Sequence, residues 1–167
     1  MTASGDQGTA SRKVLVIGLG NPLMGDDGAG AAAAEVLAND RRLARRVDVI
    51  SADTDVLSCA NRMERRRRVL LIDAVQGDVP GNVSVLRESP SVDGQQHAHH
   101  LSAPAMLALL RQVTPTLRDT EFIWILVTVG SASVGMRLSP EVAAAIPKVV
   151  ERVRQELRRR PATGVVA

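Results

Sequence analysis

Five short aliphatic stretches recur along the chain and predict the strands of one sheet. β-branched and aliphatic residues dominate each stretch, as is usual in strands. Three of the five are almost continuously apolar, which is typical of parallel strands covered on both faces. The pattern therefore predicts a parallel sheet between two layers of helices, with strands at residues 14–18, 47–51, 69–75, 83–87 and 122–129.

Apolar residues at helical spacing fill the gaps between these stretches and give the order βαβαββαβα. Ser139 followed by Pro140 is an N-cap before a first-turn proline, which fixes the start of the last helix. Only a short link with the turn sequence VPGN separates strands 69–75 and 83–87, so these two should pair as an antiparallel hairpin at one sheet edge. We expect a single three-layer α/β domain with one antiparallel edge strand and helices over residues 28–38, 54–64, 102–113 and 140–158.

The two ends of the chain differ from this core. Residues 1–12 and 159–167 show no apolar period, which predicts flexible tails around one domain spanning residues 13–158. No apolar stretch approaches the roughly 20 residues that cross a bilayer, and the first residues lack the apolar core of a signal peptide. We therefore expect a cytoplasmic protein with no membrane partner.

Arginine supplies most of the positive charge, and its runs at 65–68 and 158–160 invite a nucleic-acid interpretation. The net charge is only +3, and the only aromatic residues, Phe122 and Trp124, lie inside an aliphatic run where they cannot stack on bases. We therefore expect no nucleic-acid partner. The runs are better explained as a solvated helix end and as the last turn of the final helix.

Cys59 is the only cysteine, so the chain can form neither an internal disulfide nor a cysteine cluster. Cys59 lies in the second predicted helix and is expected to be a small buried hydrophobe. Any bound metal must use oxygen and nitrogen ligands.

The first strand leads into a glycine loop, VLVIGLGNPLMGDDGAG, at residues 14–30. A dinucleotide-binding loop would need glycine at Leu23, and Pro22 removes a backbone donor. Asp26 and Asp27 would also repel a pyrophosphate at the helix N-terminus. A nucleotide-binding oxidoreductase is therefore a weak alternative. One aspartate is explained as a helix cap, but two in succession before glycines indicate a further role.

Polar residues that follow the aliphatic runs mark the carboxyl ends of the strands, where sites form in parallel sheets. Asp27 ends the first loop, and Asp73 interrupts LLIDAV, where it needs either a helix amide or a cation as partner. All three histidines, His97, His99 and His100, lie together before a helix. Asp27, Asp73 and one histidine would form a metal-ligand set with open coordination positions, which suits a reactive or sensing site.

The motifs GLGNPLMGDDGAG, LLIDAV, HHL before a helix and GMRLSPEV before the last helix occur in this order. Over residues 13–158 the chain resembles the nickel-iron hydrogenase maturation endopeptidases. The resemblance implies a twisted, mostly parallel five-stranded sheet. It also implies an endopeptidase that removes the C-terminal extension of a hydrogenase large-subunit precursor after nickel insertion.

The same resemblance assigns the metal-contacting and catalytic positions to Asp27, Asp73 and His99, with His100 adjacent. The nickel would be supplied by the substrate precursor, and zinc or cadmium would be a substitute in vitro. The loop SADTDVLS replaces a glycine–threonine turn of typical members and is expected to contact the substrate. We expect a monomer. A non-catalytic module that binds the nickel-loaded precursor stays open as an alternative, because no independent nucleophile is visible.

Overall fold

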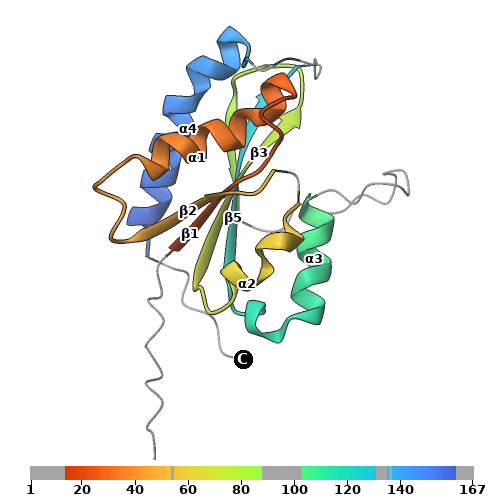
Figure 1. Cartoon of the computed structure of the whole chain (residues 1–167), viewed down its shortest axis with the longest axis vertical. Coiled ribbons are helices and arrows are strands. Elements are labelled where there is room, and N and C mark those ends of the chain that lie inside the picture. Colours follow the sequence, from red (N-terminus) through yellow and green to blue (C-terminus); the bar gives the residue numbers. More distant parts are fainter. Residues whose placement is uncertain (1–13, 54, 88–102, 131–134, 136, 161–167) are drawn as a thin grey trace, which may run out of the picture.

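Five strands form one mixed sheet in the computed structural model, which describes residues 14–53, 55–87, 103–130, 135 and 137–160 (Figure 1). The strand order is β2-β1-β3-β5-β4. The first four strands of this order run parallel, and only β4, at one edge, is antiparallel. The strands are β1 (Val14–Gly18), β2 (Val47–Ser51), β3 (Arg68–Gln76), β4 (Val83–Leu86) and β5 (Glu121–Val129).

Helices cover both faces of the sheet, as the sequence predicted (Figure 1). Alternate side chains of the central strands supply the two cores, because successive strand residues point to opposite faces. Val16 packs with helices α1 (Ala29–Ala38) and α4 (Pro140–Arg158), whereas Leu15 and Ile17 pack with α2 (Ala60–Met63) and α3 (Ala103–Val113). No helix among the described residues is long and apolar enough to span a membrane.

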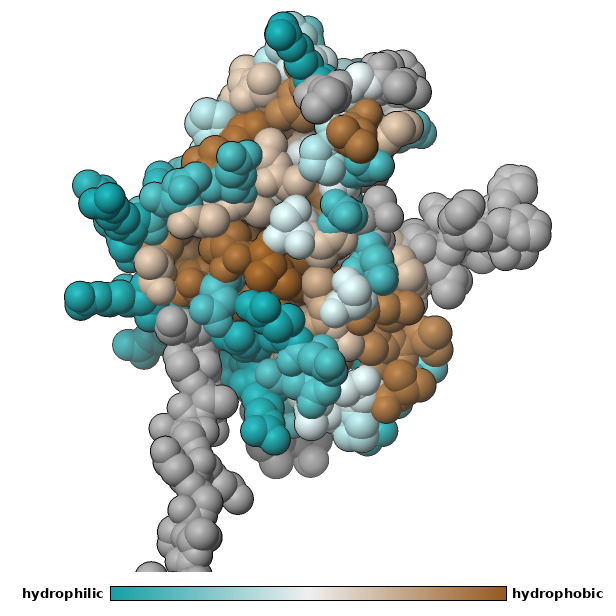
Figure 2. Space-filling view, viewed as in Figure 1, coloured by the Kyte–Doolittle hydropathy of each residue, from teal (hydrophilic) through white to brown (hydrophobic). Residues whose placement is uncertain are grey.

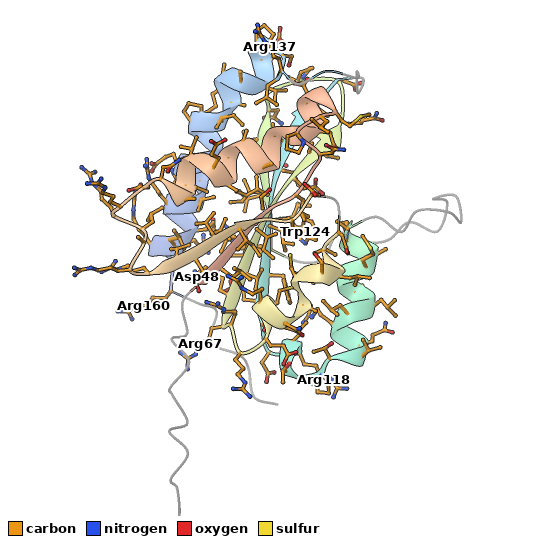
Figure 3. The ribbon with its side chains drawn as sticks, in the orientation of Figure 1. Asp48, Arg67, Arg118, Trp124, Arg137 and Arg160 are labelled. Carbon is orange, nitrogen blue, oxygen red and sulfur yellow. The ribbon has the colours of Figure 1, made fainter. Side chains whose placement is uncertain are left out.

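The best-predicted elements are those with strong local signals. α4 has the predicted bounds, and its predicted N-cap is confirmed, because Ser139 Oγ accepts a hydrogen bond of 3.4 Å from Val142 N–H. Trp124 and Phe122 are buried in β5, within the aliphatic run that the sequence predicted as a strand. Figure 3 shows Trp124 between the sheet and the layer formed by α2 and α3.

The predicted hairpin is wrong in its pairing. β4 is the antiparallel edge strand, but it pairs with β5 and not with β3. β3 is already occupied on both sides, by β1 and by β5. The link at residues 77–82 instead crosses the end of β5, where Gly77 N–H donates to Val129 O and Thr128 N–H donates to Asn82 O. The short link therefore passes the end of β5, and the chain returns as β4 on the other side of β5.

The second predicted helix is much shorter than residues 54–64. It consists of a 3-10 turn, η2 (Leu57–Cys59), followed by the single turn of α2. Asp55 begins it, because Asp55 Oδ1 accepts hydrogen bonds from the N–H groups of Leu57 and Ser58. The helix ends after Met63, since Glu64 is extended and Arg65 has a φ of 61°.

The expectation that residues 65–68 form a solvated helix end is wrong for Arg68. Its side chain is 3% exposed and lies at the start of β3. The guanidinium donates to Glu121 Oε2 at 2.7 Å and to the carbonyl oxygens of Glu156 and Arg159 at 2.8 and 3.0 Å. Arg68 therefore ties β3 to the C-terminal end of α4, where a cation is favoured. Its neighbour Arg67 is exposed, and Figure 3 shows it at the outer end of the sheet.

We predict that Arg68→Met lowers the free energy of unfolding by about 3 kcal/mol, because the partly buried carboxylate of Glu121 loses its cation and two carbonyl groups lose their donor. Urea denaturation followed by circular dichroism measures the change. The matched control is the exposed Arg67→Met, which should change stability by less than about 0.5 kcal/mol. Equal effects of the two substitutions would contradict this role for Arg68.

Candidate active site

Asp73 lies in the part of β3 that extends beyond the end of its neighbour β1. The register pairs Gly18, the last residue of β1, with Ile72, so Asp73 is the first residue of β3 beyond the end of β1. The space beside it is taken by the loop after β1, which begins with a hydrogen bond of 2.8 Å from Leu19 N–H to Ile72 O. The 3-10 turn η1 (Gly25–Gly28), which carries Asp27, contacts β3. The fold thus brings Asp27 and Asp73 to the same carboxyl edge of the sheet.

Backbone N–H groups of the glycine loop form hydrogen bonds with acceptors of the protein itself. Gly20 has a φ of 107°, and a Cβ there would overlap the Asp27 carbonyl oxygen, so glycine is required. Asn21 N–H donates to Asp27 Oδ2 at 2.7 Å, and Asn21 Oδ1 accepts from Leu23 N–H at 2.9 Å. Gly20 N–H donates to Asp53 O at 2.5 Å. These amides are therefore not available to a phosphate, which argues against the nucleotide-binding alternative.

The two adjacent aspartates have different roles. Asp26 Oδ1 accepts a hydrogen bond of 2.6 Å from Ser139 N–H and so ties the loop to the start of α4. Asp27 is held only at Oδ2, by Asn21 N–H, among the described residues. Neither aspartate caps α1 or η1 through its side chain. One aspartate is thus structural, and Asp27 keeps an oxygen for a ligand.

Gly30 allows α1 to approach the sheet closely at this edge. A Cβ on Gly30 would overlap the carbonyl oxygens of Leu19 and Ile72. The first turn of α1 therefore lies directly against the backbone of β3 and of the loop after β1. This contact fixes η1, which immediately precedes α1, close to Asp73.

Asp73 occupies an environment that disfavours its charged form. Burial raises the pKa of Asp73 from 3.8 to about 6, the nearby charge of Asp27 adds to the rise, and a hydrogen bond from Ala74 N–H opposes it. That bond, to Oδ1 at 2.9 Å, is the only partner of the Asp73 carboxyl group among the described residues. A cation placed between the two carboxylates would therefore relieve an unfavourable charge arrangement.

We predict that Asp73→Asn stabilises the protein at neutral pH. Because the folded-state pKa is raised, the wild type gains stability below about pH 4 and loses it as the pH rises through about 6. At about 1.4 kcal/mol per pKa unit, the variant should be more stable by about 3 kcal/mol at most above pH 7 and by little at pH 4. Urea denaturation across this range tests the prediction. The control is exposed Asp78→Asn, and a destabilised Asp73→Asn variant at pH 8 would contradict it.

The predicted histidine ligand lies outside the described residues. This applies to His97, His99 and His100, so His99 as the third ligand stays a prediction. Within the described part of the chain, no three His, Cys, Asp or Glu side chains gather as a metal site. α3 begins at Ala103, directly after the segment that holds the histidines. The structure thus describes two of the three residues predicted as ligands, and their role as ligands stays a prediction.

Two neighbouring residues clarify the site. Cys59 is buried in the core below α2 and α3, and burial raises the pKa of its thiol, so it is a core residue as expected. Asp53 was missed by the sequence reasoning. Asp53 has a φ of 36°, a strained backbone conformation for a residue other than glycine. Its carbonyl oxygen accepts the hydrogen bond from Gly20 N–H and so fixes the loop. Only its place in the loop after β2 hinted at this role.

Comparisons with known proteins agree with this geometry. A sequence model described as hydrogenase maturation protease matches residues 31–156. Protein FrxA from Pyrococcus furiosus is 30% identical over 139 residues, which are 81% of this chain and 98% of FrxA. The chain belongs to the hydrogenase maturation protease family. It is therefore a protease, and so a hydrolase.

Solved structures of hydrogenase maturation proteases share the fold. The NiFe hydrogenase maturation protease HybD from Thermococcus kodakarensis is 31% identical, with a TM-score of 0.70 over 87% of this chain and 99% of HybD. The hydrogenase maturating endopeptidase HybD from E. coli is 23% identical, with a TM-score of 0.68 over 87% and 92% of the two chains. The family match contains Asp73 and position 99, whereas Asp27 lies just before it.

Proposed function

We propose that this protease removes the C-terminal extension of a nickel-iron hydrogenase large-subunit precursor after nickel has been inserted. Membership of the hydrogenase maturation protease family supports the substrate class. The observation that carries the proposal is the position of Asp27 and Asp73 together at the carboxyl edge of the sheet. Because the charge of Asp27 disfavours the charged form of Asp73, the pair favours a cation between them.

The proposed role of the metal follows from its ligands. Nickel in the precursor would be held by soft thiolates, and Asp27, Asp73 and His99 would contact it without removing it. The metal would thus belong to the substrate, and zinc or cadmium would be substitutes in vitro. A nickel-free precursor would give the two carboxylates nothing to bind. The site would therefore act as a checkpoint that permits cleavage only of the loaded precursor.

The metal would place the scissile peptide beside the site and supply Lewis-acid polarisation of the reacting groups. This chain's contribution is positional. Asn21 holds one oxygen of Asp27, and Ala74 N–H holds one oxygen of Asp73, so both carboxylates have fixed orientations. The lack of a side chain at Gly20 lets the loop close on the Asp27 backbone, and the lack of one at Gly30 lets α1 pack against Ile72 of β3.

The test is to incubate the purified protein with nickel-loaded and nickel-free precursor from the same organism. Mass spectrometry then detects loss of a C-terminal peptide. We expect cleavage of the loaded form alone. Cleavage of both forms would overturn the checkpoint. Binding of the loaded precursor without any cleavage would favour the alternative of a non-catalytic precursor-binding module.

A further inference from the structure

A groove of about 460 Å³ lies between α1 and β2, the edge strand of the sheet. One wall is α1, with Ala31 and Ala38, and the other is β2, with Val49 and Ser51. Gly25 and Gly28, from the loop that holds Asp27, also line the groove. Figure 2 shows this region as a hydrophobic band between α1 and β2 on the surface of the molecule.

The β2 wall offers unpaired backbone groups. β2 pairs with β1 alone among the described strands. Ala52 N–H donates to Gly18 O at 3.0 Å, so the even-numbered residues of this segment face β1. Because backbone groups alternate along a strand, Val49 and Ser51 direct their N–H and C=O groups to the open edge. Val47 N–H, in the same outward series, already donates to Leu43 O, whereas Val49 and Ser51 have no such partner among the described residues.

The shape and chemistry of the groove suit an extended peptide. Donors and acceptors at strand spacing are what β-strand addition requires, and side chains of an added strand alternate between the groove floor and solvent. The α1 wall is lined by alanines, which leave space for apolar side chains. Glu35 is the one charged residue among the described residues that line the groove, so an acidic segment would be repelled.

We propose that a neutral or basic extended segment of the polypeptide substrate binds in this groove as a sixth strand beside β2. This inference rests on the proposed function, since it takes the substrate to be the precursor that the protease cleaves. The groove is lined by Gly28, which follows Asp27 in the sequence, so a segment bound there lies beside the loop that carries Asp27. The main chain of β2 therefore positions the substrate, and α1 selects its side chains.

The first experiment alters the substrate and leaves the protein intact. Synthetic peptides that span the cleavage region of the cognate precursor, each N-methylated at one backbone nitrogen, are tested for binding by fluorescence anisotropy. Strand addition predicts that methylation at alternate residues weakens binding about tenfold, while methylation at the residues between has little effect. Uniform or absent sensitivity to methylation would overturn the proposal.

The second experiment fills the groove. Ala31→Phe should raise KM for the precursor about tenfold and weaken peptide binding equally, with kcat unchanged, because the catalytic carboxylates are not touched. The matched control is Val36→Phe, also on α1, where the side chain is 48% exposed and lies outside the groove. Circular dichroism verifies that both variants fold. Equal KM values for the two variants would contradict the proposal.

The two readouts separate this inference from the proposed function. If the wild type binds the peptide with alternating sensitivity to methylation and cleaves no precursor, the groove proposal stands and the proteolytic function fails. If the wild type cleaves the loaded precursor and Ala31→Phe leaves both KM and peptide binding unchanged, the function stands and the groove proposal fails.

Discussion

Asp27→Asn and Asp73→Asn are each expected to abolish cleavage of the nickel-loaded precursor. Each substitution keeps the size of the side chain and replaces a carboxylate, the proposed oxygen ligand, with a neutral amide. Loss of a group that merely supports a metal ligand costs roughly 10–100-fold, so loss of a ligand should lower kcat/KM by more than about 100-fold. Rates of peptide release by mass spectrometry measure the effect.

Asp26→Asn is the matched control, because Asp26 is adjacent in sequence and has a structural role. The amide oxygen of asparagine can still accept the hydrogen bond that Ser139 N–H gives to Asp26 Oδ1. Cleavage by this variant should stay within a few-fold of the wild type. If Asp26→Asn and Asp27→Asn lose activity equally, the assignment of separate roles to the two aspartates is wrong.

The stability of Asp73→Asn makes the loss of activity interpretable. The burial that raises the pKa of Asp73 makes its carboxylate unfavourable in the folded protein, so the variant should be more stable at neutral pH. A variant that gains stability while it loses activity cannot be dismissed as misfolded. Natural proteins often carry this kind of cost at functional sites, where stability is lost to position a charge.

Most of the fold could be predicted from local patterns, and the errors occurred where tertiary packing decides. β1 and β2 have the predicted bounds, because short runs rich in β-branched and aliphatic residues favour strands. β4 pairs with β5, which occupies one side of β3 and follows much later in the sequence, so no local pattern reports this pairing. Arg68 looks like its exposed neighbours in sequence, and only the end of α4 distinguishes it.

The position of both carboxylates at the carboxyl edge of the sheet could also be predicted, because Asp27 ends the loop after the first apolar run and Asp73 interrupts another. The sequence could not separate Asp26 from Asp27, since the partner of Asp26 is the backbone of Ser139, more than 100 residues away. Asp53 was missed for a similar reason. Its contribution is a backbone carbonyl in a strained conformation, which no side-chain pattern reports.

The second large effect is expected at the histidines. His99→Ala should lower kcat/KM for the nickel-loaded precursor by more than about 100-fold, because the proposed nitrogen ligand is lost. The resemblance assigns this role to His99, and adjacent side chains of a chain point in different directions. His100→Ala should therefore stay within a few-fold of the wild type. Cleavage assays on both variants measure the difference.

Free imidazole tests whether the group lost in His99→Ala is an imidazole ligand. If His99 supplies an imidazole ligand, added imidazole should restore part of the activity of His99→Ala and none of that of Asp27→Asn, whose missing group is a carboxylate. Activity lost in His100→Ala and kept in His99→Ala would move the ligand by one residue and leave the two-carboxylate site intact. Activity kept in both variants would mean that Asp27 and Asp73 act without a histidine from this segment, so that the proposed ligand set is wrong.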